Sequence, residues 1–223
     1  MDRSIVISLD AMGGDHAPRV VVEALRSARL QIPDIRFILF GDRNAIARYM
    51  DDGMKDYVEV RHTDQVIASD DKPSQALRRG KKSSMRLAID AVRDGEAQGV
   101  VSGGNTGALM AMSLFSLRPI AGIDRPAIAG FMPTMRGESV MLDLGANAVC
   151  DETNLVQFAL LGADFCRAVL GRETPSVGLL NMGEEELKGD EVVRGAAERL
   201  RAMDNPGFRY HGFVEGTDIT RGV

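Results

Sequence analysis

Short apolar and β-branched runs alternate with segments of helical spacing along most of the chain. Runs such as IVISL and SVMLDL are almost continuously apolar, which is typical of strands covered on both faces. Strands are predicted at Ser4–Leu9, Arg36–Phe40, Tyr57–Arg61, Gly99–Ser102, Ser139–Asp143, Ser176–Leu180 and Phe208–Phe213. Their alternation with helices indicates an α/β fold with a mostly parallel sheet and helices on both of its faces.

Apolar stripes at helical spacing predict helices between these strands. The clearest stripes cover Val21–Ile32, Met85–Val92 and Leu155–Val169. Pro18 lies near the start of the first helix, and Ser83 and Ser84 are candidate N-caps of the second. We interpret each stripe as a packing face.

The stretch 118–135 interrupts the alternation with Pro119, Pro126 and Pro133 and two glycines. Prolines at this density predict an irregular loop or arm with at most an edge strand. No repeat or low-complexity tract divides the chain, so we expect a single α/β domain over residues 1–223. Because the last residues stop where another strand would begin, the chain looks cut short.

Composition excludes several classes of protein. The net charge is −5, there is no tryptophan and only 5% of residues are aromatic, which argues against nucleic-acid binding. No signal peptide is visible, and no apolar run approaches the ~18 residues of a spanning helix, so a cytoplasmic location is expected. Cys150 and Cys166 make neither a disulfide framework nor a zinc site, and no metal is expected.

The predicted strand ends are rich in glycine and small polar residues. These loops cover residues 10–18, 102–107, 143–147 and 181–185. A glycine-rich turn that leads into a helix leaves N–H groups unpaired at the positive end of the helix dipole, which favours an anion. SGGNTGAL fits best. Any one loop is equally consistent with a simple tight turn, but four at strand ends favour a shared cleft.

Other motifs of nucleotide binding or nucleophilic catalysis are missing. There is no GxGxxG after the first strand, no GxxxxGK[ST] loop and no GxSxG elbow. Neither cysteine has a reactive context, so covalent catalysis is poorly supported. For Asp10 and Asp15 the alternatives are to bind a metal, to orient a donor or to cap the next helix.

A basic segment spans residues 72–86. Six of its residues are basic: Lys72, Arg78, Arg79, Lys81, Lys82 and Arg86. A charge run is usually a solvated face. In an acidic protein, a local basic patch is also a candidate docking site for phosphate or an acidic partner.

Taken in order, the motifs resemble one family. DAMGGDHAP, KPSQALRRGKKSSM, VSGGNTGALMA, RPAIAGFMP, MLDLGANAVCDETNLVQFALLGA and LLNMGEEELKGDE are similar to the PlsX-type phosphate acyltransferases of phospholipid synthesis. The resemblance covers essentially the whole chain. Gly103 stands where we expect alanine in the family, and the family's C-terminal portion is missing.

The resemblance implies transfer of a fatty acyl group from acyl carrier protein to inorganic phosphate, without a cofactor. The implied fold is a three-layer α/β/α sandwich, similar to the phosphotransacetylases and the isocitrate and isopropylmalate dehydrogenases. It also implies a homodimer, association at the membrane periphery and a glycerol-phosphate acyltransferase as partner.

Site roles follow as a hypothesis. The predicted catalytic residues are Asp10, Asn105, Asn181 and Lys188, with Lys188 as the cation at the reacting centre. The predicted substrate-binding residues are Gly13, Gly14, Asp15, Lys82, Ser83, Ser84, Gly103, Gly104, Thr106, Gly107 and Asn147. Residues 103–106 are expected to cradle phosphate, and Lys82 with Ser83 is the second choice of cation site.

Two alternatives stay open. One is a phosphotransacetylase that acts on acyl-CoA, since it would use the same cleft. The other is an inactive fragment that binds phosphate or carrier without turnover. An isocitrate-type dehydrogenase is less well supported, because no arginine-rich substrate motif or metal-binding aspartate pair is found.

Overall fold

The computed structural model describes residues 4–183 and 189–222. By its internal contacts the chain divides into two compact units, residues 1–118 and 119–223, and each is described by itself. The expectation of a single α/β domain stays a prediction.

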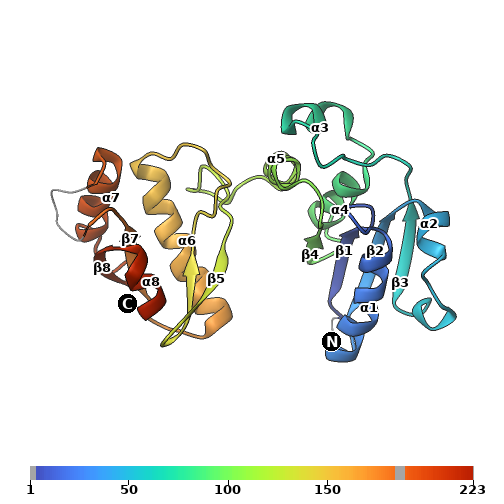
Figure 1. The fold of residues 1–223 in the computed structure, drawn as a ribbon, viewed down its shortest axis with the longest axis horizontal. Coiled ribbons are helices and arrows are strands. Elements are labelled where there is room, and N and C mark those ends of the chain that lie inside the picture. Colours follow the sequence, from blue (N-terminus) through green and yellow to red (C-terminus); the bar gives the residue numbers. More distant parts are fainter. Residues whose placement is uncertain (1–3, 184–188, 223) are drawn as a thin grey trace. The chain divides into compact units, whose positions relative to one another are not determined.

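The first unit is built on a parallel sheet with strand order β3-β2-β1-β4 (Figure 1). The strands are β1 (Val6–Asp10), β2 (Arg36–Gly41), β3 (Val58–His62) and β4 (Gly99–Val101). The helices are α1 (Arg19–Gln31), α2 (Arg43–Ala47), the 3-10 turn η1 (Asp52–Met54), α3 (Pro73–Arg79), α4 (Ser84–Arg93) and α5 (Thr106–Leu117). The strands predicted for this part of the chain are confirmed, with ends that differ by about two residues at most.

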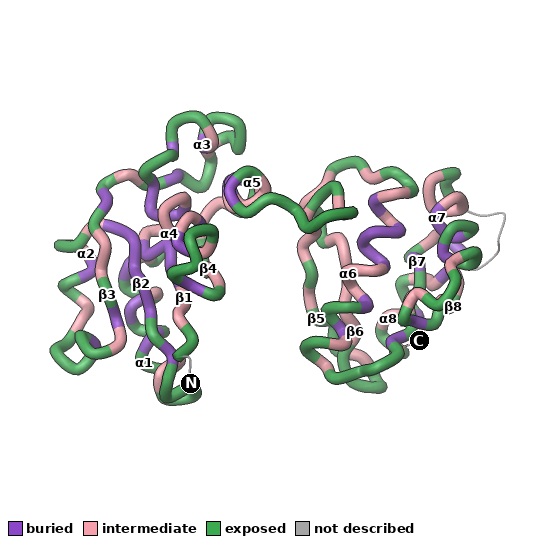
Figure 2. The backbone as a smooth tube through the Cα atoms, turned by 180° about the vertical axis from the view of Figure 1, so that it is seen from behind, coloured by how far each residue is buried: buried purple, intermediate pink, exposed green. Residues whose placement is uncertain are grey.

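Side chains alternate between the two faces of the sheet, so each face meets different helices. Leu9, Phe37 and Leu39 pack with α1, α2 and η1 on one face. Ile38 and Phe40 pack with α4 on the other face. Buried residues concentrate in β1, β2 and α4 (Figure 2). The first unit therefore has the predicted α/β/α layers.

Helix α5 packs against α4, and α3 packs against α5. Ile67, Ala76, Met85, Ala108 and Met112 form their shared core. This packing holds the start of α5 beside the start of α4, and both starts follow loops that the sequence predicted as site segments.

The second unit contains a hairpin, a parallel strand pair and helices (Figure 1). Its elements are β5 (Gly130–Thr134), β6 (Gly137–Met141), α6 (Glu152–Leu170), β7 (Ser176–Leu180), α7 (Glu191–Arg201), β8 (Arg209–Val214) and α8 (Gly216–Arg221). The hairpin β5–β6 is antiparallel, and β7 pairs in parallel with β8. Helices α6 and α7 pack on β7 and β8 through Val156, Ala197, Leu200 and Phe213.

The irregular stretch 118–135 consists of a loop and one strand. Residues 118–129 lie outside helices and strands, whereas the end of the stretch forms β5. Pro133 lies within β5, opposite Glu138, a position that an edge strand tolerates. Strand β6 also ends at Met141, two residues earlier than predicted, because the Asp143 carboxylate organises the loop that follows.

Candidate functional site

The carboxyl ends of β1 and β4 lie side by side, because these parallel strands are paired from Ile7–Gly99 to Leu9–Val101. The loops that follow pack backbone against backbone: a Cβ built on Gly14 would lie 3.2 Å from the carbonyl oxygen of Gly103. Gly14 also has a φ of +107°, which favours glycine. The first unit thus brings together the two glycine loops predicted to share a site, here named the β1 loop (residues 10–14) and the β4 loop (residues 102–105).

The buried carboxylate of Asp10 joins these loops. Its Oδ2 accepts a hydrogen bond from Ser102 Oγ at 2.8 Å, and its Oδ1 accepts one from the N–H of Met12 at 3.2 Å. Ser102 Oγ in turn accepts the N–H of Gly104 at 3.1 Å. Asp10 therefore orients hydrogen-bond donors, which is one of the roles expected of it. These donors are the hydroxyl of Ser102 and the N–H of Met12.

Asn105 is fully engaged within the fold. Its Oδ1 accepts the N–H of Ala108 at 2.9 Å, so it is the N-cap of α5. Its Nδ2 donates to the carbonyl oxygens of Ala68, Ser69 and Asp71 at 3.2, 3.0 and 2.8 Å. These bonds fit a residue that shapes the loop; its catalytic role stays a prediction.

The first turn of α5 lies open to solvent. Thr106 and Gly107 are exposed, whereas the neighbouring N–H of Ala108 is capped by Asn105. Asp15 is also exposed, and the N-cap of α1 is Pro18, with no side-chain cap bond. The alternative in which Asp15 caps α1 is therefore wrong.

The start of α4 carries the other predicted residues of this unit. Ser83 is its N-cap, as predicted: its Oγ accepts the N–H of Arg86 at 3.2 Å and donates to the carbonyl oxygen of Gly80 at 2.7 Å. Ser84 is fully buried, and its hydroxyl has no hydrogen-bond partner among the residues that the structure describes. Lys82 is exposed beside them.

In the second unit, Asp143 holds the loop after β6. Its Oδ1 accepts the N–H groups of Ile128 and Ala146, and its Oδ2 accepts the N–H and the side-chain amide of Asn147. Burial tends to raise the pKa of Asp143, but these hydrogen bonds outweigh it and hold the pKa below its ordinary value. Asn147 also donates to the carbonyl oxygen of Pro126 at 2.9 Å, so its amide serves the loop.

Cys150 follows in the same loop. Partial burial raises the pKa of its thiol, and the negative charge of Asp143 adds to that shift. Both effects disfavour the thiolate, the nucleophilic form of cysteine.

The loop after β7 contains the last predicted residues. Asn181 donates from its side-chain amide to the carbonyl oxygen of Gly183 at 3.0 Å. Lys188, the predicted cation at the reacting centre, lies outside the described residues.

Sequence comparison decides the family. The family described as "Fatty acid synthesis protein" matches residues 5–223. The chain belongs to this family.

Curated relatives of the chain carry the name phosphate acyltransferase. The relative from Paramagnetospirillum magneticum is 51% identical over 227 residues, and the one from Rhodospirillum rubrum is 52% identical over 225. Each match covers 100% of this chain and 64% of the relative. The family resemblance recognised in the sequence is confirmed, and the chain spans about two thirds of the length of these relatives.

Solved structures support the fold. The EutD phosphotransacetylase from Staphylococcus aureus superposes with a TM-score of 0.65 at 15% identity, covering 95% of this chain and 69% of that one. A phosphotransacetylase from Streptococcus pyogenes gives a TM-score of 0.69 at 16% identity, with coverage of 96% and 69%. At this identity the likeness shows a shared fold, and the predicted phosphotransacetylase-like α/β fold is confirmed.

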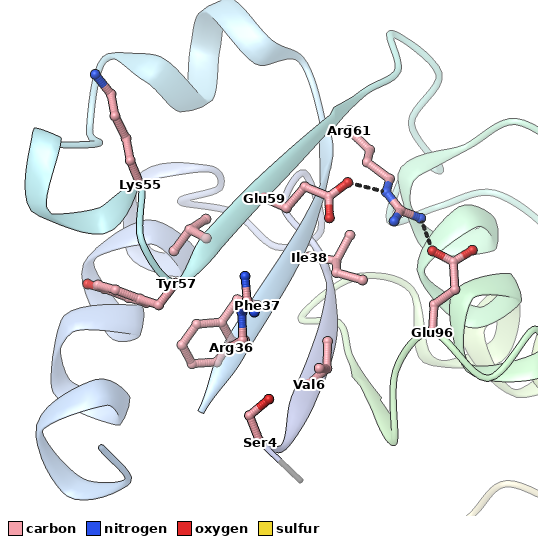
Figure 3. Close-up of a pocket in the computed structure, with 11 residues that line it drawn as sticks. Ser4, Val6, Arg36, Phe37, Ile38, Lys55, Tyr57, Glu59, Arg61 and Glu96 are labelled. Atoms are coloured by element: carbon pink, nitrogen blue, oxygen red, sulfur yellow. Dashed lines mark hydrogen bonds and ion pairs between the residues drawn. The ribbon is translucent and has the colours of Figure 1, made fainter. Parts of the chain in front are cut away.

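An open hollow of about 490 Å³ lies elsewhere in the first unit. Figure 3 shows the residues that line it. It lies near the amino ends of β1, β2 and β3, opposite the glycine loops, and Ser4 and Arg36 line it. Arg61 binds Glu59 at 2.8 Å and Glu96 at 2.5 Å across this hollow.

Residues 4–183 and 189–222 contain no cluster of three His, Cys, Asp or Glu residues placed to bind a metal ion. They also contain no helix with the length and apolar character needed to span a membrane.

Two residues of these loops were missed by sequence reasoning. Ser102 links Asp10 to Gly104, and Asp143 organises the loop of Asn147. Each lies at or just after the end of a strand and shortly before a glycine, as Asp10 does. A polar residue in that position is the signal that could have found them.

Proposed function

We propose that the whole protein transfers a fatty acyl group from acyl carrier protein to inorganic phosphate. A phosphate oxygen attacks the thioester carbonyl carbon, the C–S bond breaks, and the thiolate of the carrier leaves and takes up a proton. The products are acyl phosphate, for phosphatidic acid synthesis, and free carrier. The names of the curated relatives support this reaction.

The observation that carries the proposal is the close packing of the β1 and β4 loops at the start of α5. The glycines there let the two loops pack closely, and the N–H groups of the exposed residues Thr106 and Gly107 lie at the positive end of the helix dipole. Such donors suit an anionic substrate and a developing oxyanion.

The chemistry makes modest demands on the protein. A thiol with a pKa of ~8.5 is a good leaving group, and phosphate is already anionic at neutral pH. Positioning and electrostatic stabilisation are therefore the main tasks. We assign phosphate binding to the backbone of residues 103–107, with Lys82 at the start of α4 as a nearby cation.

Carrier binding is assigned to the basic segment. Lys72, Arg78, Arg79, Lys81 and Lys82 are exposed on α3 and the turn before α4. An acidic carrier would be attracted to this surface. The proposal also includes a homodimer in the cytoplasm, which associates peripherally with the membrane and hands acyl phosphate to a glycerol-phosphate acyltransferase.

The direct test uses the protein extended to the length of its relatives, with long-chain acyl carrier protein as substrate. Acyl phosphate is trapped with hydroxylamine, with and without phosphate. We expect phosphate-dependent product; no product from the extended protein would refute the reaction.

The second candidate is a phosphotransacetylase acting on acyl-CoA, favoured by the names of the solved structures with this fold. Competition between acyl-CoA and acyl carrier protein separates the two reactions. Tight carrier binding without phosphate-dependent product would instead indicate a fragment that binds without turnover.

A further inference from the structure

We propose that Ser102 and Asp10 form a positioning pair that sets which backbone N–H groups of the β4 loop are available to phosphate. The inference rests on the proposed function, because it concerns how the phosphate site of that reaction is built. Ser102 acts through the backbone and is a positioning residue.

The direction of each hydrogen bond follows from its partners. An N–H can only donate, so Ser102 Oγ accepts from Gly104 and must direct its own proton elsewhere. That proton points to Asp10 Oδ2, 2.8 Å away. The other carboxylate oxygen of Asp10 accepts from Met12. Both partners of Asp10 are donors, and each of its two side-chain oxygens accepts one of these bonds.

Burial and packing leave no room for substrate inside this cluster. Asp10 is 3% exposed. A Cβ built on Gly13 would lie 2.5 Å from Asp10 Oδ2, 2.8 Å from Gly104 N and 2.9 Å from Ser102 Oγ. Gly13 thus closes the cluster from one side. The pair can influence phosphate only through the loop that it holds.

The bonds divide the N–H groups of the loop into two sets. Gly104 is held inward by Ser102, and Ala108 is capped by Asn105. Among the residues that the structure describes, the N–H groups of Gly103, Asn105, Thr106 and Gly107 have no acceptor within the protein. The proposed phosphate donors within residues 103–107 are therefore these four, and the N–H of Gly104, which is bound to Ser102, is not among them.

The test compares the variants Ser102→Ala and Ser102→Thr. The control is Ser27→Ala, at an exposed position on α1. Loss of the hydroxyl should raise KM for phosphate about ten-fold and leave KM for acyl carrier protein unchanged. Ser102→Thr keeps the hydroxyl and should restore most of the affinity. If Ser102 had a purely structural role, Ser102→Ala would lower the melting temperature without raising the KM for phosphate selectively over the KM for acyl carrier protein.

A second readout is independent of turnover. Inorganic phosphate is titrated into the ¹⁵N-labelled protein, and amide shifts are followed. We expect saturable shifts at residues 103 and 105–107, smaller ones at Gly104, and much weaker binding in Ser102→Ala.

The outcomes separate the two proposals. Phosphate binding at this loop that depends on Ser102, without acyl transfer, would sustain the positioning pair and refute the reaction. Acyl transfer with the same phosphate KM in Ser102→Ala would refute the pair alone. Saturable phosphate binding that leaves the amides of residues 103–107 unmoved would also overturn the pair.

Discussion

At the scale of single residues, many polar side chains of the candidate loops bind the protein's own backbone. Asn105, Asn147 and Asp143 each satisfy several backbone groups, and Ser102 and Asp10 satisfy each other. Buried polar groups are expected to find such partners, because an unmade hydrogen bond is costly. These residues therefore shape the loops.

Adjacent serines at the start of α4 should respond in opposite ways to the same change. Ser83→Ala removes the N-cap and should cost about 0.5–2 kcal/mol of unfolding free energy. Ser84→Ala removes a buried hydroxyl without a partner among the described residues, and should be neutral or stabilising. Denaturant unfolding of both variants measures this. Equal losses would contradict the assignment of the cap to Ser83.

Asp143 should make the stability of its unit depend on pH. Asp143→Asn places an amide donor against backbone donors and should cost about 1–3 kcal/mol at pH 7. The folded-state pKa of Asp143 is lowered, so its stabilisation is present above the unfolded value of ~3.9 and is lost as the pH falls through the folded pKa.

The measurement is urea unfolding of the parent and Asp143→Asn at pH 7 and at lower pH. The difference in free energy should shrink as the pH falls below ~3.9. Asp164→Asn, an exposed carboxylate on α6, is the control for general charge effects. A difference that stayed constant with pH would rule out the carboxylate as its origin.

At the scale of elements, α5 is fastened at its start to the segment before α3. Asn105 makes this connection. Its side-chain oxygen caps α5, and its side-chain NH2 group donates to carbonyl oxygens within residues 68–71. Gly107 also approaches Pro73, since a Cβ on Gly107 would lie 2.9 Å from Pro73 Cγ. The position of the predicted anion site thus depends on α3 as well as on the sheet.

Substitutions of Asn105 should separate its role as N-cap of α5 from its hydrogen bonds to the carbonyl groups of residues 68–71. Asn105→Ser retains a good N-cap but cannot reach the carbonyl groups of residues 68–71. Asn105→Asp also caps, but its carboxylate faces those carbonyl oxygens, so it should lose more stability than serine despite similar cap preference. Hydrogen exchange across residues 66–72 and thermal unfolding measure the effect. Stability and exchange in Asn105→Ser equal to those of the parent would show that the hydrogen bonds to residues 68–71 contribute nothing.

At the scale of the whole molecule, the chain carries a net charge of −5, yet exposes basic residues on α3 and the following turn. Arg86 belongs to the same segment but is paired with Asp90 at 2.8 Å and is not part of this exposed surface. The local excess of positive charge is what an acidic carrier would meet first.

Reversing the charge of this surface should raise the KM for acyl carrier protein. The double variant Arg78→Glu/Arg79→Glu should raise KM for acyl carrier protein about ten-fold at low salt, with KM for phosphate little changed. Added salt should narrow the difference from the parent, because it screens exposed charges. Arg48→Glu, an exposed arginine elsewhere in the first unit, is the control. A rise in both KM values, or none, would place carrier binding elsewhere.

Much of the fold could be predicted from the sequence. Strand positions follow from short apolar runs, whose burial on both faces leaves a pattern that one sequence displays directly. Ser83 was found as a cap because capping depends on residues close together in the chain. The β5–β6 hairpin was missed as a pair, since Pro133 signals an irregular segment and pairing depends on the partner strand.

The sequence by itself determined the layered α/β architecture, the family and the glycine loops at strand ends. All three rest on local patterns or on long ordered motifs. Tertiary structure alone decided which polar atoms of those loops are hydrogen-bonded within the protein. Ser102 and Asp10 are 92 positions apart, and Asn105 lies more than thirty positions from the carbonyl groups that it binds. Only the pairing of β1 with β4 and the packing of α3 on α5 bring these groups within hydrogen-bond distance, because contact depends on the folded path of the chain.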